Sequence, residues 1–291
     1  MHVAIIFNPN STGDSEKNAR ELASTVRKDK RYKVDVMPTH HAGHAQELAR
    51  DYALKHTDSI VMSSSGDGGY NEVVNGLMEA IEQGANPIAA VIPSGNANDH
   101  DRAVRDNTLT EAVLRCQPRP MDLLEVASTA ADGTRSVRFA HSYIGLGLTP
   151  AVAVELNKHN LNALREMMVL ARSFAAFEPL TITLNGRDRL IDSLIISNIG
   201  GMAKVLKLAQ RSAFDDGLFE VNVFPHGHKA RLILKLLRGA TFGLHASKRT
   251  NAYDFAVTKA IPIQLDGEIV KLAKNTKVHV ACRKHAIRTL A

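Results

Sequence analysis

The 291-residue sequence contains two cysteines, five tyrosines and no tryptophan, and each scarcity removes a class of protein. Cys116 and Cys282 are far apart and stand in no metal-ligand spacing, so we expect neither a disulfide framework nor a zinc site. A reducing cytoplasm fits this pattern. The few aromatic residues do not supply the stacking platforms of single-strand nucleic-acid binders. No nucleic-acid partner is therefore expected.

The chain also lacks long uncharged apolar runs. It starts MHVAIIFNPN, a short apolar run with no basic region before it, which predicts a first strand rather than a signal peptide. No other stretch is both long and uncharged enough to span a bilayer, so a soluble, cytoplasmic protein is expected. The formal net charge of +6 favours approach to anionic lipid surfaces, nucleic acid or phosphorylated substrates, and does not choose between them.

In the first third, short apolar runs alternate with helical patterns. Strand-like runs occupy residues 3–7, 33–37, 59–63 and 87–92, and the first three precede apolar residues at helical spacing. This alternation predicts a parallel sheet covered by helices, hence an α/β domain over residues 1–120. A chain of 291 residues with 44% hydrophobic residues is also more typical of two domains than of one.

The pattern changes at the QPRP stretch that ends with Pro120. Alternating apolar and polar residues around Asp-Gly and Asn-Gly turns predict a mainly antiparallel β domain over residues 121–291. Whether its last segment packs back on the first domain is left open. Two helical insertions are expected, Leu161–Phe177 and Lys229–Leu237. The first is too apolar for a narrow stripe, so core packing, a lipid-access groove and a homodimer interface all remain open. The pattern of the second is typical both of an interfacial membrane helix and of an amphipathic helix that packs on the protein.

Four loops are expected at one edge of the parallel sheet, where ligands bind in open α/β folds. They span residues 8–13, 39–43, 63–69 and 93–99 and are rich in Gly, Ser, Thr, Asn and Asp. In the third, Ser65-Gly66-Asp67-Gly68-Gly69, the glycines and the following helix N-terminus predict a phosphate cradle. Asp67 would repel phosphate unless a cation lies between them, which implies Mg²⁺. For such a loop alone, a plain tight turn is the alternative.

The histidines at positions 40, 41 and 44 raise a second question about metal binding. No carboxylate or cysteine stands with them in a recognised motif spacing. We therefore expect a polar loop followed by a helix start there.

The glycine-rich loop is neither a Walker A motif nor a dinucleotide-binding GxGxxG. The order of SGDGGYNEVVNG, PSGNANDHDR, DDGLFEV and LDGE, after an opening NPNSTG, resembles the diacylglycerol kinase catalytic family, in its soluble bacterial lipid-kinase branch. The resemblance covers nearly the whole chain. It implies a nucleotide-binding, NAD kinase-like α/β domain with a parallel sheet, followed by a mainly antiparallel β-sandwich domain for the lipid substrate.

The resemblance also implies roles for particular residues. It implies that ATP is surrounded by Asn8, Pro9, Asn10, Ser11, Thr12, Thr39, Gly66, Asp67, Gly68, Gly69, Tyr70, Asn71, Glu72 and Asn96. It implies that Asp67 and Asp99 belong to a carboxylate and water network around Mg²⁺, and that a further Mg²⁺ site uses the Asp216 side chain and the Leu218 carbonyl. The general base would be Asp266 or Glu268.

Four positions depart from the family pattern. Ser65 stands where a first glycine is usual, Gly69 and Asn96 stand where threonines are usual, and Ala213 replaces a frequent lysine. Losing one hydroxyl contact to a charged group costs about 1.5–3 kcal/mol, which predicts weakened ATP binding without loss of activity.

These features imply an ATP- and Mg²⁺-dependent lipid kinase that phosphorylates the hydroxyl of diacylglycerol or a related lipid, with catalysis between the two domains. Transient membrane-surface contact and a peripheral location follow from such a substrate. Two other functions stay open. One is an NAD kinase or other small-molecule kinase that shares the GGDG core. The other is a non-catalytic lipid- or nucleotide-binding regulator, against which the retained acidic residues argue.

Overall fold

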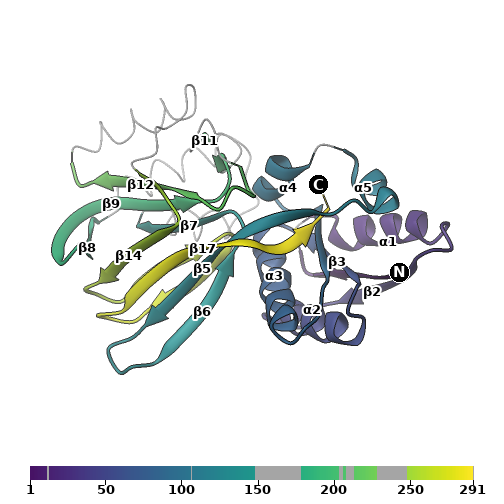
Figure 1. The fold of residues 1–291 in the computed structure, drawn as a ribbon, viewed down its shortest axis with the longest axis horizontal. Coiled ribbons are helices and arrows are strands. Elements are labelled where there is room, and N and C mark those ends of the chain that lie inside the picture. Colours follow the sequence, from purple (N-terminus) through teal and green to yellow (C-terminus); the bar gives the residue numbers. More distant parts are fainter. Residues whose placement is uncertain are drawn as a thin grey trace. The chain divides into compact units, whose positions relative to one another are not determined.

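The computed structural model describes residues 1–11, 13–105, 107–147, 178–202, 206–207, 213–227 and 248–290 (Figure 1). Thr12 and the expected helices Leu161–Phe177 and Lys229–Leu237 lie outside the described residues. The chain divides into two compact units. The first unit consists of Met1–Leu123, Phe214–Asp216 and Lys284–Ala291, and the second of Leu124–Ala213 and Gly217–Arg283.

The first unit is an α/β structure. Its elements are β1 (His2–Phe7), α1 (Ser15–Val26), β2 (Lys33–Pro38), α2 (His44–Lys55), β3 (Ile60–Ser65), α3 (Asp67–Glu82), β4 (Ile88–Pro93), α4 (Asp99–Val104) and α5 (Leu109–Arg115). Strands β2, β1, β3 and β4 pair in that order, all parallel. The end of β17 (Lys277–Thr289) pairs with β4, also parallel. The prediction of a parallel N-terminal sheet is confirmed.

Burial explains why these runs became strands. Every residue of β3 is buried, as expected for a central strand covered on both faces. In α1, the helical-spacing residues Ala19, Leu22, Ala23 and Val26 form the buried face. α5 begins with a capping box in which Thr108 and Glu111 each satisfy the other's backbone N–H. The short helix α4 has no comparable sequence signal.

The second unit is antiparallel. Its elements are the rest of β5 (Arg119–Thr129) and of β17, with β6 (Arg135–Ala140), β7 (Tyr143–Gly147), β8 (Leu180–Leu184), β9 (Arg187–Ser197), β10 (Gly201–Met202), β11 (Leu206–Lys207), β12 (Phe219–Pro225), β13 (Lys248–Thr250), β14 (Ala252–Val257), β15 (Ile261–Leu265) and β16 (Glu268–Leu272). The order β16-β15-β7-β9-β8-β14-β17 is antiparallel throughout, β12 pairs with β9, and β5 lies between β17 and β6. The predicted change from parallel to antiparallel structure is confirmed.

One apolar core holds the second unit together, with buried side chains from β5 to β9, β12 and β14 to β17. The Asn185-Gly186 turn between β8 and β9 has positive φ at both residues, as a two-residue hairpin requires. The alternating run TRSVRFAHSYI forms two strands, β6 and then β7, interrupted at His141 and Ser142. No helix in the part of the chain that the structure describes is long and apolar enough to cross a membrane.

Candidate active site

The predicted phosphate loop lies between β3 and α3, where Gly66 is the N-cap and Asp67 the first helical residue. The Asp67 carboxylate accepts backbone N–H groups of Asp99, at 3.3 Å, and His100, at 3.2 Å. Both donors belong to the first turn of α4, whose N–H groups have no partner within the helix. These two bonds join the third loop to the fourth and place Asp67 next to Asp99. Asp99 is buried, with 5% of its surface exposed.

Glycines let the loop backbones touch. A Cβ built on Gly95 would lie 2.3 Å from Cα of Gly66, and one built on Gly13 would lie 2.1 Å from the carbonyl oxygen of Ser94. Neither position accepts a side chain without backbone movement. The first, third and fourth loops therefore meet at one edge of the sheet.

Buried hydroxyl groups reinforce this junction. Ser64 Oγ donates to the carbonyl of Ser15 at 2.7 Å, and the Ser15 hydroxyl donates to the carbonyl of Ser64. Ser94 Oγ lies 3.1 Å from Ser64 Oγ and accepts the Asn18 side-chain amide at 2.9 Å. Ser15, Ser64 and Ser94 are all buried. Since buried polar groups are costly unless paired, this network fixes the loops where β3 and β4 end.

The second loop is tied to the same helix by Glu72. Its carboxylate accepts the N–H of Gly43 at 3.0 Å and that of Ala45 at 3.2 Å, at the start of α2. An acidic group at a helix N-terminus is stabilising. Glu72, expected near ATP, thus holds the loop that contains Thr39. Thr39 itself is half-buried and donates its backbone N–H to the carbonyl of Phe7 at 2.8 Å.

Other members of the expected ATP set also make contacts within the first unit. Tyr70 and Asn71 are buried, and the Tyr70 ring centroid lies 4.9 Å from that of His100. Asn75 donates its side-chain amide to the backbone carbonyl of Asn71 at 2.9 Å. Asn96 is exposed on the fourth loop. The structure therefore gathers these residues around the loops but buries two of their side chains.

A side chain at residue 69 would need the space that the Ser65 side chain fills. A Cβ built on Gly69 would lie 2.7 Å from Oγ and 2.8 Å from Cβ of Ser65. The Ser65 hydroxyl lies 2.6 Å from Ser63 Oγ and donates to the carbonyl of Gly66 at 2.9 Å. The two departures from the family pattern in this loop are therefore a single coupled change.

The first loop borders a hollow of about 340 Å³. It is lined by Asn8, Pro9, Gly13, Asp14, Ser15, Glu16 and Lys17. Within the loop, Asn8 Oδ1 accepts the backbone N–H of Asn10 at 2.9 Å, and the Asn8 carbonyl accepts that of Ser11 at 3.1 Å. Asn8, Pro9 and Asn10 are exposed. The loop is a turn with accessible side chains, as contact with a ligand requires.

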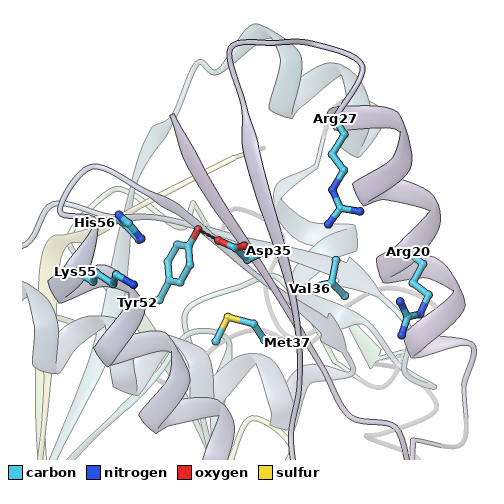
Figure 2. A pocket seen from close by; sticks show the side chains of 8 residues that line it. All are labelled: Arg20, Arg27, Asp35, Val36, Met37, Tyr52, Lys55 and His56. Carbon is cyan, nitrogen blue, oxygen red and sulfur yellow. Dashed lines mark hydrogen bonds between the residues drawn. The ribbon is translucent and has the colours of Figure 1, made fainter.

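A larger hollow of about 650 Å³ lies along the edge strand β2 (Figure 2). It is lined by Arg20, Arg27, Asp35, Val36, Met37, Tyr52, Lys55 and His56. The Tyr52 hydroxyl donates to Asp35 Oδ2 at 2.8 Å, and burial with this bond raises the pKa of Tyr52. None of its lining residues belongs to the four loops, so it is a feature of the sheet edge and not part of the candidate site.

In the second unit, Asp266 and Glu268 are in different environments. Asp266 is fully buried, and its carboxylate accepts backbone N–H groups of His141, Ser142 and Tyr143 at 2.8–3.0 Å. Its backbone N–H donates to the carbonyl of Tyr143 at 2.9 Å. Glu268, the first residue of β16, is partly exposed. Of these two residues, Glu268 is therefore the one whose carboxylate is partly accessible to solvent.

The expected second Mg²⁺ site depends on the Asp216 side chain and the Leu218 carbonyl. Asp215 and Asp216 belong to the first unit, and Gly217 and Leu218 to the second. Asp215 lies 3.6 Å from Arg119 in an ion pair, and its carbonyl lies 3.1 Å from His285 Nε2. Asp216 and Leu218 are partly exposed.

The histidines at the start of α2 do have a carboxylate neighbour. Side-chain ligand atoms of His41, His44 and Glu47 lie within 4.8 Å of one another. However, His44 Nδ1 accepts the backbone N–H of His40 at 3.1 Å. That bond gives Nδ1 of His44 a hydrogen-bond partner within the loop. The geometry agrees with the expected polar loop and helix start.

Sequence reasoning missed the residues that surround Asp266. His141 and Ser142 stand inside an alternating pattern typical of a continuous strand, and Asn198 follows the end of β9. No local sequence signal distinguishes these residues as part of a site. They are recognisable only because long-range pairing brings residues 141–143 next to residue 266.

The chain is similar in sequence to known proteins. A model of the diacylglycerol kinase catalytic domain matches residues 2–126. A diacylglycerol kinase of Bacillus subtilis (strain 168) is 28% identical over 284 residues, which cover 91% of this chain and 88% of that protein. A diacylglycerol kinase of Staphylococcus haemolyticus is 37% identical over 102 residues, covering 34% of this chain and 29% of that protein.

Solved structures show the same fold at low identity. A diacylglycerol kinase from Bacillus anthracis has a TM-score of 0.70 at 17% identity, covering 99% of this chain and 96% of that one. Yeast NADH kinase complexed with NADH has a TM-score of 0.51 at 11% identity, covering 100% of this chain and 83% of that one.

Proposed function

We propose that this chain is a member of the diacylglycerol kinase catalytic family, whose model matches residues 2–126, and that it transfers the terminal phosphoryl group of ATP to the hydroxyl of diacylglycerol or a related lipid. The observation that carries the proposal is the junction at Asp67. There, the first, third and fourth loops meet beside the N-terminus of α3, and Asp67 binds the N-terminus of α4. Such a junction suits a phosphate tail, because backbone N–H groups at helix N-termini attract anions.

The acidic residues of this junction fit a magnesium ion. Asp67 and Asp99 bring carboxylates to the joined third and fourth loops, and oxygen ligands of this kind suit Mg²⁺. When bound, Mg²⁺ would offset the charge of the phosphates. The backbone of Gly66–Gly69 would orient the phosphate tail for in-line attack, which is the main requirement of phosphoryl transfer.

We assign the proton acceptor for the lipid hydroxyl to Glu268. An alcohol is poorly ionised at neutral pH, so a carboxylate must take its proton as the new bond forms. Asp266 is unsuited to this task because its oxygens already accept three backbone N–H groups and it is fully buried. The partial exposure of Glu268 supports its assignment.

The test is transfer of labelled phosphate from ATP to a panel of lipid alcohols, with NAD and sugars as competing acceptors. We expect labelled product with the lipid alcohols only, and only when Mg²⁺ is present. Asp67→Asn keeps an oxygen acceptor for α4 but removes the charge, and should lower kcat by about 100-fold or more. The matched control is Asp35→Asn, which neutralises a carboxylate on β2 in the same unit.

Two results would contradict the proposal. One is unchanged turnover in a folded Asp67→Asn protein, which would remove the junction from the chemistry. The other is labelled NAD or sugar in place of labelled lipid, which would favour a small-molecule kinase. Magnesium-dependent turnover of any acceptor would exclude a purely regulatory role.

A further inference from the structure

A two-residue break, His141 and Ser142, separates β6 from β7, and its backbone N–H groups all point to one carboxylate. The N–H of His141 donates to Asp266 Oδ2 at 2.9 Å. Those of Ser142 and Tyr143 donate to Asp266 Oδ1 at 2.8 and 3.0 Å. A carboxylate that accepts several N–H groups is strongly held, because hydrogen bonds to a charged group are stronger than neutral ones.

The carbonyl groups of residues 141–143 accept hydrogen bonds from Asn198 and from the backbone of Asp266. The His141 carbonyl accepts the side-chain amide of Asn198 at 3.3 Å, and the Ser142 carbonyl accepts the Asn198 backbone N–H at 2.8 Å. The Tyr143 carbonyl accepts the N–H of Asp266 at 2.9 Å. Every backbone polar group of residues 141–143 named here is therefore paired, which fixes the segment in one conformation.

The imidazole of His141 adds a further bond to the carboxylate. Its Nε2 lies 3.3 Å from Asp266 Oδ2, and its Nδ1 lies 2.7 Å from Ser142 Oγ. All three side chains are completely buried. The partners assign the hydrogens: the Ser142 hydroxyl donates to Nδ1, and Nε2–H of a neutral ring donates to the carboxylate. The order serine, histidine, aspartate is that of a catalytic triad, but burial excludes a substrate.

Because Asp266 is held in this way, the position of Glu268, two residues later, is also restricted. The φ of Asp266, +54°, lies in the left-handed region, which is rare for residues other than glycine. Its carbonyl is held by the Gln264 side-chain amide at 2.7 Å. Asp266 and Gly267 form the turn from β15 to β16, and Glu268 is the next residue, paired with Leu265. The direction in which Glu268 leaves the turn thus depends on how Asp266 is held.

We propose that His141 is a positioning residue for phosphoryl transfer, which fixes the Asp266 carboxylate and thereby the turn that presents Glu268. This role rests on the proposed function, in which Glu268 accepts the proton of the lipid hydroxyl. Asp266 is then also a positioning residue. The Ser142 hydroxyl contributes by setting the orientation and the tautomer of the ring.

Two amide substitutions separate positioning from general packing. In His141→Gln the amide nitrogen can reach the place of Nε2 and still donate to Asp266. In His141→Asn it can reach only the place of Nδ1. We expect His141→Asn to lower kcat by roughly 10- to 100-fold, the loss of one hydrogen bond to a charged group, while KM for ATP changes less than about twofold. His141→Gln should retain kcat within about threefold.

The control is His279→Asn in β17. His279 Nδ1 lies 2.7 Å from Asp254, but both side chains are exposed, so kcat should not change. If His141→Asn yields no folded protein, Ser142→Ala replaces it, because that change leaves both His141 and Asp266 in place. It should lower kcat by about 3- to 10-fold through the misoriented ring.

Several outcomes would overturn the proposal. One is wild-type kcat in folded His141→Asn or Ser142→Ala. Another is an equal loss in the Asn and Gln variants that follows their melting temperatures, since that indicates packing alone. Glu268→Gln distinguishes the two hypotheses. If it retains full turnover, the proton acceptor of the proposed function is wrong and the role of His141 falls with it. If it loses turnover while His141→Asn keeps it, only the role of His141 is wrong.

Discussion

Ser65 lies at the end of β3 and Gly69 in the first turn of α3, and a side chain at residue 69 would need the space that Ser65 fills. From the sequence, Gly69 means a lost hydroxyl and weaker ATP binding. In the structure, the Ser65 hydroxyl fills this position in the loop and is bound to Ser63 and Gly66. The effect of the serine at position 65 therefore has to be judged together with the effect of the glycine at position 69.

Substitutions at residues 65 and 69 test this coupling. Gly69→Thr alone should overpack the loop and destabilise the protein by about 1–3 kcal/mol, measured by urea unfolding. Ser65→Gly together with Gly69→Thr should recover most of that stability and lower KM for ATP. Ser65→Gly alone serves as the control. If the two single effects simply add in the double mutant, the residues are not coupled.

At the scale of elements, α2 and α3 pack with their backbones in close approach. A Cβ built on Gly76 would lie 2.1 Å from the carbonyl oxygen of Gln46, so only glycine fits there. Glu72, one turn earlier, binds the N-terminus of α2. The positions of Glu72 and Gly76 in α3 are thus explained partly by helix packing, although the resemblance places Glu72 near ATP.

Gly76→Ala tests that explanation. Alanine favours a helix interior by about 1 kcal/mol over glycine, so without the contact the protein should become more stable. Because the backbone of Gln46 blocks the new methyl group, we expect a net loss of about 1–3 kcal/mol in thermal or urea unfolding. Glu82→Ala, at the exposed end of the same helix, is the control and should change stability by less than about 0.5 kcal/mol. A more stable Gly76→Ala protein would contradict the packing argument.

At the scale of the whole molecule, the first unit is completed by residues from the far end of the chain. In the last strand, Arg288 and Thr289 pair with Ile88 and Ala89 of β4. Ile287 and Leu290 are buried, at 2% and 1% exposure. The α/β unit therefore depends on residues separated by about 200 positions, as the backbone bond from Leu290 to Ala89 illustrates.

Removal of residues 284–291 should accordingly destabilise the first unit. Burial of two large aliphatic side chains is worth about 3–6 kcal/mol, a large fraction of typical domain stability. The deletion also leaves β4 as an unprotected edge. We expect a melting temperature lowered by several degrees or aggregation on expression, measured by calorimetry and size-exclusion chromatography. Deletion of Ala291 alone is the control. An unchanged melting transition in the longer deletion would show that this strand is dispensable.

Much of the fold and part of the site follow from local sequence. Apolar runs and helical spacing predicted the four parallel strands and the three long helices, and Asp-Gly and Asn-Gly turns predicted the later hairpins, because these signals depend on neighbours in the chain. The motifs around Asp67 and Asp266 also predicted two acidic sites, and the roles of these residues stay predictions.

What the tertiary structure alone decided is how those acids are held. Asp67 and Glu72 bind the starts of other helices, and Asp266 is enclosed by His141, Ser142 and Asn198. Sequence reasoning left Asp266 and Glu268 equivalent, since both are carboxylates two residues apart. Burial and pairing distinguish them, and both depend on contacts between residues more than 100 positions apart, which no local pattern records.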